Sequence, residues 1–202
     1  MAALVTPGAH IERLERDALE IGERIRVCVA DLVSSQLTWH PPEGGWSVAE
    51  CLEHLTITNG LYVEATEVVL AGTPQIDPAM APDFKPGPIA ARFIRMLEPG
   101  KGRYKAPKPF QPTRDLARAD AVARFFEVHS RVCELIGRLR FMDLTRTRVA
   151  SPVSPMIRFR IGDMMDVVLV HSKRHVLQAE KVKLRLDFPG TSVETDANAK
   201  EE

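Results

Sequence analysis

Cysteine is scarce in this sequence: Cys28, Cys51 and Cys133 are the only three among 202 residues. Their number is odd, they lie far apart, and none belongs to a C-x-x-C pair. These features exclude a disulfide framework and a structural zinc site built from cysteines. We therefore expect free, buried thiols, as in a protein of the reducing cytoplasm.

The sequence also lacks a long apolar run, an apolar leader and an excess of either charge. No run approaches the roughly 18 apolar residues of a membrane span, and residues 1–10 lack the basic and then apolar segments of a secretory signal. Lysine plus arginine equals aspartate plus glutamate, at 27 each, so no global field attracts nucleic acid or an anionic membrane. We expect a cytoplasmic protein that binds neither nucleic acid nor membrane.

Alternating β-branched positions are few, so no sheet is expected, whereas four segments have helical periodicity. In the first segment, apolar residues recur at alternating steps of three and four, which is typical of a helix packed against nearly parallel neighbours. These residues are Ile11, Leu14, Ala18, Ile21, Ile25, Cys28 and Leu32. Prolines and glycines between Pro41 and Gly45 then interrupt the pattern.

A second helix is predicted to begin at about Val48. Ser47 is the expected N-cap, and Glu50 three residues later completes a capping box. The helix should run to about Leu70, because Gly72 follows closely. Its buried stripe is expected to hold Cys51, His54, Ile57, Thr58, Leu61, Ala65 and Val68.

Residues 72–112 differ in composition, because they hold nine of the 15 prolines. A helix of more than about ten residues fits there only between Pro88 and Pro99. Such a length is unusual between bundle helices, and a crossover along the bundle would explain it. Basic residues outnumber acidic ones in it: Lys85, Arg92, Arg95, Lys101, Arg103, Lys105 and Lys108 against Asp77, Asp83 and Glu98. We favour a solvated surface connection over the alternative, a lid that attracts an anionic substrate.

A third helix is predicted from Thr113, with Asp115 in its first turn, to about Arg140. Its inner face should hold Leu116, Ala119, Ala123, Phe126, Cys133 and Ile136. A proline-containing loop, 151–155, then leads through Arg158-Phe159-Arg160 to a last helix from about Gly162 to Leu186.

These segments predict an all-α fold: an up-and-down four-helix bundle with one long crossover connection between helices two and three. Residues 1–188 are expected to form this single domain, in which 72–112 is the proline-rich crossover with its short helix. Residues 189–202 are small, polar and acidic, and are expected to be a disordered tail.

Three histidines indicate a metal site. His171 and His175 are one helical turn apart and fall on an apolar stripe, so both rings can reach one ion. His54 falls on the buried stripe of the second helix. Two or three inward imidazoles are unfavourable unless each finds a partner, and a metal satisfies them together. Three imidazoles with an open fourth position suit catalytic zinc, and also nickel, iron or manganese.

The remaining candidates are weaker. Gln178 faces the same way as His171 and is expected to orient a ligand or a bound water. Cys51 and Glu50 lie one turn before His54, but small size and capping explain them more simply. His129 lies at the edge of the third helix's inner face, and His10 and His40 are expected to be solvated.

Two sequence runs resemble the DinB-like superfamily. The run from Trp39 to Leu55 contains the W-S-x-x-E pattern followed by H-L that members often show before and within their second helix. The run from His171 to Gln178 resembles the closing H-x-x-x-H-x-x-Q motif of the same family. The resemblance covers roughly residues 10 to 187 in order, spacing and helix placement.

The resemblance implies a four-helix bundle, a metal site at His54, His171 and His175, and a homodimer. The stretch 72–112 looks longer than the minimal family pattern, which leaves the shape of the pocket mouth open. Relatives include metal-dependent transferases and isomerases that use low-molecular-weight thiols such as bacillithiol or mycothiol, and hydrolases.

Two hypotheses of function follow. The first is a metal-dependent enzyme that acts on a small molecule, either a thiol S-transferase or a hydrolase, with a metal-bound water or thiolate as the reacting group. The second is a non-catalytic metal-binding or stress-response bundle protein. An open coordination position reached by a cavity favours the first, and a fourth protein ligand favours the second.

Overall fold

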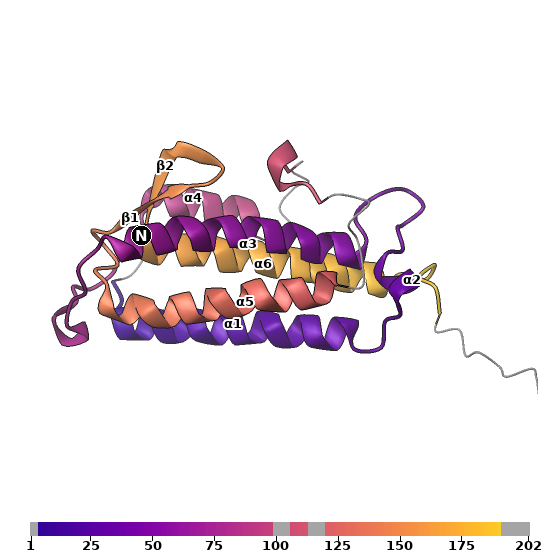
Figure 1. Ribbon diagram of the computed structural model, residues 1–202, viewed down its shortest axis with the longest axis horizontal. Helices are drawn as coiled ribbons and strands as arrows, with labels where there is room; N and C mark the ends of the chain where they lie inside the picture. Colours follow the sequence, from indigo (N-terminus) through magenta and orange to yellow (C-terminus); the bar gives the residue numbers. More distant parts are fainter. Residues whose placement is uncertain (1–3, 99–105, 113–119, 191–202) are drawn as a thin grey trace, which may run out of the picture.

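Four long helices lie side by side along the molecule (Figure 1). A computed structural model describes residues 4–98, 106–112 and 120–190. The long helices are α1 (Pro7–Val29), α3 (Val48–Ala71), α5 (Ala121–Arg138) and α6 (Ile161–Lys183). Helices α1 and α3 each pack against both α5 and α6. The prediction of a mainly helical fold is confirmed.

Helix α1 follows its predicted pattern. Thr6 caps it, with its hydroxyl accepting a hydrogen bond from the Ala9 amide at 3.3 Å, and Pro7 occupies the first helical position, where no amide is needed. The predicted apolar residues from Ile11 to Cys28 are all buried. The short helix α2 (Ser34–Leu37) then leads into the loop before α3.

Helix α3 begins at Val48, as predicted. The Glu50 amide donates to the Ser47 hydroxyl at 3.1 Å, and the Ser47 amide donates to the Glu50 carboxylate at 2.9 Å. This reciprocal capping box fixes the helix start. The predicted buried stripe is wrong near the C-terminus, because Val68 is 75% exposed. The buried positions there are instead Tyr62, Val63, Thr66 and Leu70.

The long connection after α3 contains the predicted short helix, α4 (Pro88–Leu97), which packs against α6. Two short 3-10 helices, η1 (Pro78–Met80) and η2 (Lys108–Phe110), lie before and after it. Phe84 pairs with Val5 in an isolated β-bridge and is fully buried. Lys101, Arg103 and Lys105 lie outside the described residues.

The inner face predicted for α5 is correct at Ile136, which is fully buried, and correct in part at Phe126 and Cys133, which are half-buried against the core. Ala123 is exposed, whereas Phe125, His129 and Val132 are buried. The 3-10 helix η4 (Leu139–Phe141) follows directly. The predicted first turns of this helix, with Asp115, Leu116 and Ala119, lie outside the described residues.

The prediction that no sheet forms is wrong. Strands β1 (Arg148–Ser151) and β2 (Ser154–Arg160) form an antiparallel hairpin in place of the expected loop. Val149 and Phe159 pair across it and are buried against the helices, whereas their neighbours Arg148 and Arg158 are exposed. With one large apolar residue buried in each strand, the sequence shows no period-2 pattern by which the strands could be recognised.

The last helix, α6, ends at Lys183, three residues before the predicted end. The chain then turns back. The Phe188 ring packs edge-on against Trp39 at 5.4 Å between centroids, and the Gln36 amide donates to the Pro189 carbonyl at 2.9 Å. The predicted tail from residue 191 onward lies outside the described residues. None of the helices in the described part of the chain has the length and hydrophobicity needed to cross a bilayer.

Candidate metal centre

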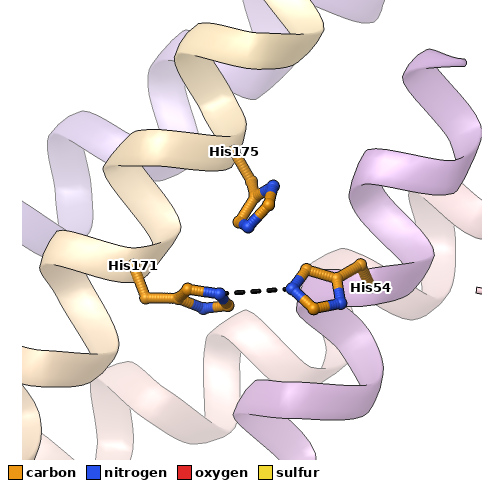
Figure 2. Close-up of side chains that lie close together, drawn as sticks. All are labelled: His54, His171 and His175. Carbon is orange, nitrogen blue, oxygen red and sulfur yellow. Dashed lines mark hydrogen bonds between the residues drawn. The ribbon is translucent and has the colours of Figure 1, made fainter. Parts of the chain in front are cut away.

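The three predicted histidines come together at the interface of α3 and α6 (Figure 2). His171 and His175 lie one turn apart on α6, and His54 faces them from α3. The Nε2 atoms of His54 and His171 are 3.2 Å apart. One ring nitrogen from each residue lies within 4.8 Å of the other two, so a single ion can reach all three.

Hydrogen bonds orient two of the rings. The Nδ1 of His54 donates to the backbone carbonyl of Phe110 in η2 at 2.5 Å. The Nδ1 of His175 donates to the side-chain oxygen of Gln178 at 3.1 Å. Since each Nδ1 carries the proton of a neutral ring, each Nε2 keeps a free lone pair. This is the usual arrangement of metal-binding histidines.

The surroundings keep the imidazoles neutral. Burial, together with the neighbouring His171 and His54, lowers the pKa of His175 to about 2. Burial likewise lowers the pKa of His171 to about 3. It also lowers the pKa of His54, although the hydrogen bond to the Phe110 carbonyl acts in the opposite direction. Neutral imidazole is the form that binds a metal, so these residues fit a divalent ion.

A cavity of about 940 Å³ opens onto the three histidines. Its walls are mainly apolar and come from the loop before α3, from α3, α4, η2, the hairpin turn and α6: Trp46, Tyr62, Phe93, Met96, Leu97, Phe110, Val153, Val167 and Leu177. Arg174 and Lys181 on α6 and Arg185 just after it add cationic groups. The metal-binding group among the described residues holds three histidines, and no cysteine or carboxylate joins it.

Trp46 packs against two of the three histidines. Its ring lies 4.7 Å from the His54 ring and stacks on His175 at 5.5 Å. Tyr62, two turns after His54, donates to or accepts from the Ser151 hydroxyl at 3.2 Å and so connects α3 to the hairpin. Burial raises the pKa of Tyr62. The sequence pattern assigned no role to either residue, although the spacing of Tyr62 from His54 and Thr58 indicates one shared face.

The weaker candidates lie elsewhere. Cys51 is fully buried in a separate apolar cluster with Cys28 and Val48, and burial raises its pKa. Glu50 is engaged in the capping box and in a 2.8 Å contact with the His40 ring. The His129 ring stacks on Phe125 and donates to the Ala18 carbonyl at 3.0 Å. Among these weaker candidates, Gln178 has a hydrogen bond with a histidine of the group.

The expectation that His10 is solvated is wrong. Only 4% of its surface is exposed, because the Val5–Phe84 bridge covers the start of α1 and the Phe84 ring lies 4.4 Å from the imidazole. Its Nε2 lies 3.4 Å from the Gly162 carbonyl and 3.8 Å from the Asp166 carboxylate. His40 is exposed, as expected.

The family model described as the DinB superfamily matches residues 20–179, which is most of the chain and includes all three histidines. No curated protein and no solved structure matches the chain.

Proposed function

The chain belongs to the DinB superfamily, and from that premise we propose that it is a metal-dependent enzyme whose one divalent ion is held by His54, His171 and His175. The observation that carries this proposal is the combination of three converging neutral imidazoles with a cavity of about 940 Å³. Three histidines and an open position are the ligand set of catalytic zinc, and nickel, iron and manganese also suit such a site.

A divalent ion bound there would supply a Lewis acid that lowers the pKa of a bound water toward about 7, or that activates a thiolate. The protein's own groups do the positioning. The Phe110 carbonyl and Gln178 hold the rings of His54 and His175. Trp46 shields these two rings from bulk water. Apolar walls of the cavity then receive a small organic substrate.

Two reaction types fit this proposal: transfer to or from a low-molecular-weight thiol, and hydrolysis. Both need a reactant to reach the ion from the cavity side. The alternative function is a non-catalytic metal-binding or stress-response protein, in which the ion only joins α3 to α6. The cavity favours the enzyme, because a purely structural ion has no need of one.

We further propose that residues 1–188 form one domain, a four-helix bundle in which the stretch after α3 is the crossover, and that the protein is a cytoplasmic homodimer. The packing of α1 and α3 against both α5 and α6 supports the bundle. The packing of Phe188 against Trp39 supports a domain that extends to this residue, and the hydrogen bond from Gln36 to the Pro189 carbonyl extends the contact one residue into the predicted tail. Light scattering of the purified protein tests the dimer.

Metal content tests the site directly. We expect one equivalent of a divalent ion in purified wild-type protein and little in the His171→Ala variant. His129→Ala is a matched control, because it removes a buried histidine outside the group. Equal metal content in wild type and His171→Ala would contradict the proposal.

Activity is then measured on metal-loaded and chelator-treated protein. One arm uses thiol conjugation of an electrophile with several bacterial thiols, and the other uses hydrolysis of activated esters and amides. Metal-dependent turnover in either arm supports the enzyme and selects the reaction type. Normal metal binding without turnover in both arms would favour the non-catalytic alternative.

A further inference from the structure

Three arginines gather on one face of the hairpin. In its register Arg148 is opposite Arg160, and Ala150 is opposite Arg158. Side chains alternate between the two faces of a strand, and directly opposed residues share a face. The three guanidinium groups therefore project from the same side. Val149 and Phe159 take the other side and are buried in the core.

These arginines line a small pocket together with the start of α4. The pocket has a volume of about 230 Å³. Residues 87–90 form one wall, and Arg148, Arg158, Phe159, Arg160 and Asp163 form the other. This volume is below the roughly 300–1,000 Å³ of pockets for drug-sized ligands, so the pocket suits a small group. It is separate from the cavity at the three histidines, with which it shares no lining residue.

The charges in this pocket are not balanced. Asp163 is the single carboxylate in its lining, against three arginines. Both carboxylate oxygens of Asp163 accept from the Gly87 amide, at 3.0 and 3.1 Å. The Arg160 side chain donates to the Lys85 carbonyl, whereas the side chains of Arg148 and Arg158 form no hydrogen bond or close ion pair with any described residue. Arg148 and Arg160 act on the Asp163 carboxylate only through their charge. Two guanidinium groups thus remain available to a ligand.

Such an arrangement is unfavourable by itself, because like charges directly opposite each other destabilise a strand pair. Burial of Val149 and Phe159 holds the hairpin in place regardless. An anion in the pocket would remove the repulsion. The Gly87 amide at the start of α4 already donates to the Asp163 carboxylate. The ligands of the anion would therefore be the arginines and not the helix end.

We propose that this pocket binds a phosphate group. The planar fork of a guanidinium matches pairs of phosphate oxygens. A phosphate dianion presents enough oxygens to accept from several such forks at once, and its charge offsets the excess of the three arginines over Asp163. The group could belong to free phosphate or to a small phosphate ester, which have this chemistry in common.

Binding here would join two elements that also form walls of the larger cavity. Phe159 on β2 packs edge-on against Phe93 on α4, with 5.3 Å between ring centroids. Phe93 lines the cavity at the histidines, as does Val153 in the hairpin turn. The phosphate site nevertheless depends on residues outside the metal centre, so it is independent of the proposed function.

Calorimetric titration at constant ionic strength tests the proposal on the full-length protein. Inorganic phosphate and glycerol phosphate are the two probes, and acetate is the comparison anion. We expect phosphate binding to weaken by about tenfold or more in the double variant Arg148→Gln/Arg158→Gln, since the loss of even one hydrogen bond between charged groups weakens binding by about tenfold. Tighter binding of glycerol phosphate than of inorganic phosphate would identify an ester as the ligand, and the reverse would identify the free ion.

Three controls make the result specific. Arg138→Gln removes an exposed arginine on α5, outside this pocket, and should leave the affinity unchanged. Arg148→Lys/Arg158→Lys keeps the charge but loses the guanidinium forks, so it should also weaken binding. Circular dichroism and the melting temperature show whether each variant is folded.

Four outcomes would overturn the proposal, and the first three concern the arginine pocket itself. They are no binding of millimolar phosphate to the wild type, equal affinity in the wild type and the folded glutamine double variant, or binding of acetate as tight as that of phosphate. Loss of phosphate binding in both His171→Ala and chelator-treated wild type would likewise assign the anion to the metal centre.

Discussion

At the scale of single residues, the contact between Gln178 and His175 has the most direct consequence for metal binding. Gln178 accepts the Nδ1 proton of His175 and so leaves its Nε2 free. Removing such an outer partner typically weakens metal binding by roughly 10- to 100-fold. We expect that loss in Gln178→Leu, and near wild-type affinity in Gln178→Glu, which keeps the acceptor. Competition with a coloured chelator measures the metal affinity. If Gln178→Leu bound metal as tightly as the wild type, Gln178 would have no orienting role.

His129 should make stability depend on pH. Burial lowers its pKa, although the hydrogen bond to the Ala18 carbonyl acts the other way. Below the unfolded pKa of about 6.5 the unfolded chain binds a proton that the folded chain does not. The free energy of unfolding therefore falls as the pH falls below about 6.5. Burial lowers the pKa of His10 too, so it adds to the same slope.

His129→Gln is expected to reduce this slope, because glutamine can still donate to the Ala18 carbonyl but does not titrate. Urea unfolding at about pH 7.5 and about pH 5.5 measures it. Both proteins are kept in chelator, so that the three histidines of the metal centre contribute equally. An identical pH dependence in the two proteins would mean that His129 is not held neutral by the fold.

The sequence predicted the residues of the candidate site through helical spacing. His171, His175 and Gln178 are placed on one face by their positions alone, and the stripe around His54 adds the third ring. Trp46 and Phe110 were not predicted, because one acts from a loop and the other through its backbone carbonyl. Neither contact follows from the periodicity of any single element.

At the scale of secondary-structure elements, the capping box of α3 matters because it lies two turns before His54. Ser47 is fully buried, and its hydroxyl accepts the Glu50 amide. Loss of an N-cap hydroxyl costs about 1 kcal/mol, with a range of about 0.5–2. We expect Ser47→Ala to lower the free energy of unfolding by this amount, as measured with urea, and Ser47→Thr to restore most of it. No change in Ser47→Ala would show that another group satisfies that amide.

Some secondary-structure elements were predicted well from the sequence and others were not. The starts of α3 and α4 were found, because a capping box and a proline mark them locally. The hairpin was missed, because only one pair of its large apolar residues, Val149 and Phe159, is fully buried. The inner face of α5 was predicted only in part, because Phe126 and Phe125 are equally apolar and only the packing against α1 and α3 decides which of them is fully buried.

At the scale of the whole molecule, a metal ion at the three histidines would join α3 to α6. Ligand binding to the folded state alone raises its stability, by about 2.7 kcal/mol when the free ligand is 100 times its dissociation constant. We expect added metal to raise the melting temperature of chelator-treated wild type and to leave His171→Ala unchanged. A scanning fluorescence melt measures this, and an equal rise in both would mean that the ion stabilises the fold from another site.

The helical fold as a whole was predictable because four long segments carry the right period. The length of the connection after α3 was also predictable, because its prolines leave room for only one short helix. Its path was not predictable, since the bridge of Val5 to Phe84 and the contact of Phe110 with His54 join residues that are far apart in the chain.

The contact of His54 with the Phe110 carbonyl has a consequence for how this site tolerates mutation. Every amino acid carries the same carbonyl, so substitutions at position 110 leave the acceptor chemically intact. The residue type at position 110 therefore does not reveal the contact. Inserting or deleting one residue in η2 would displace the acceptor, even if every side chain there stayed the same. For the contact with His54, the number of residues in and around η2 therefore matters more than the residue type at position 110.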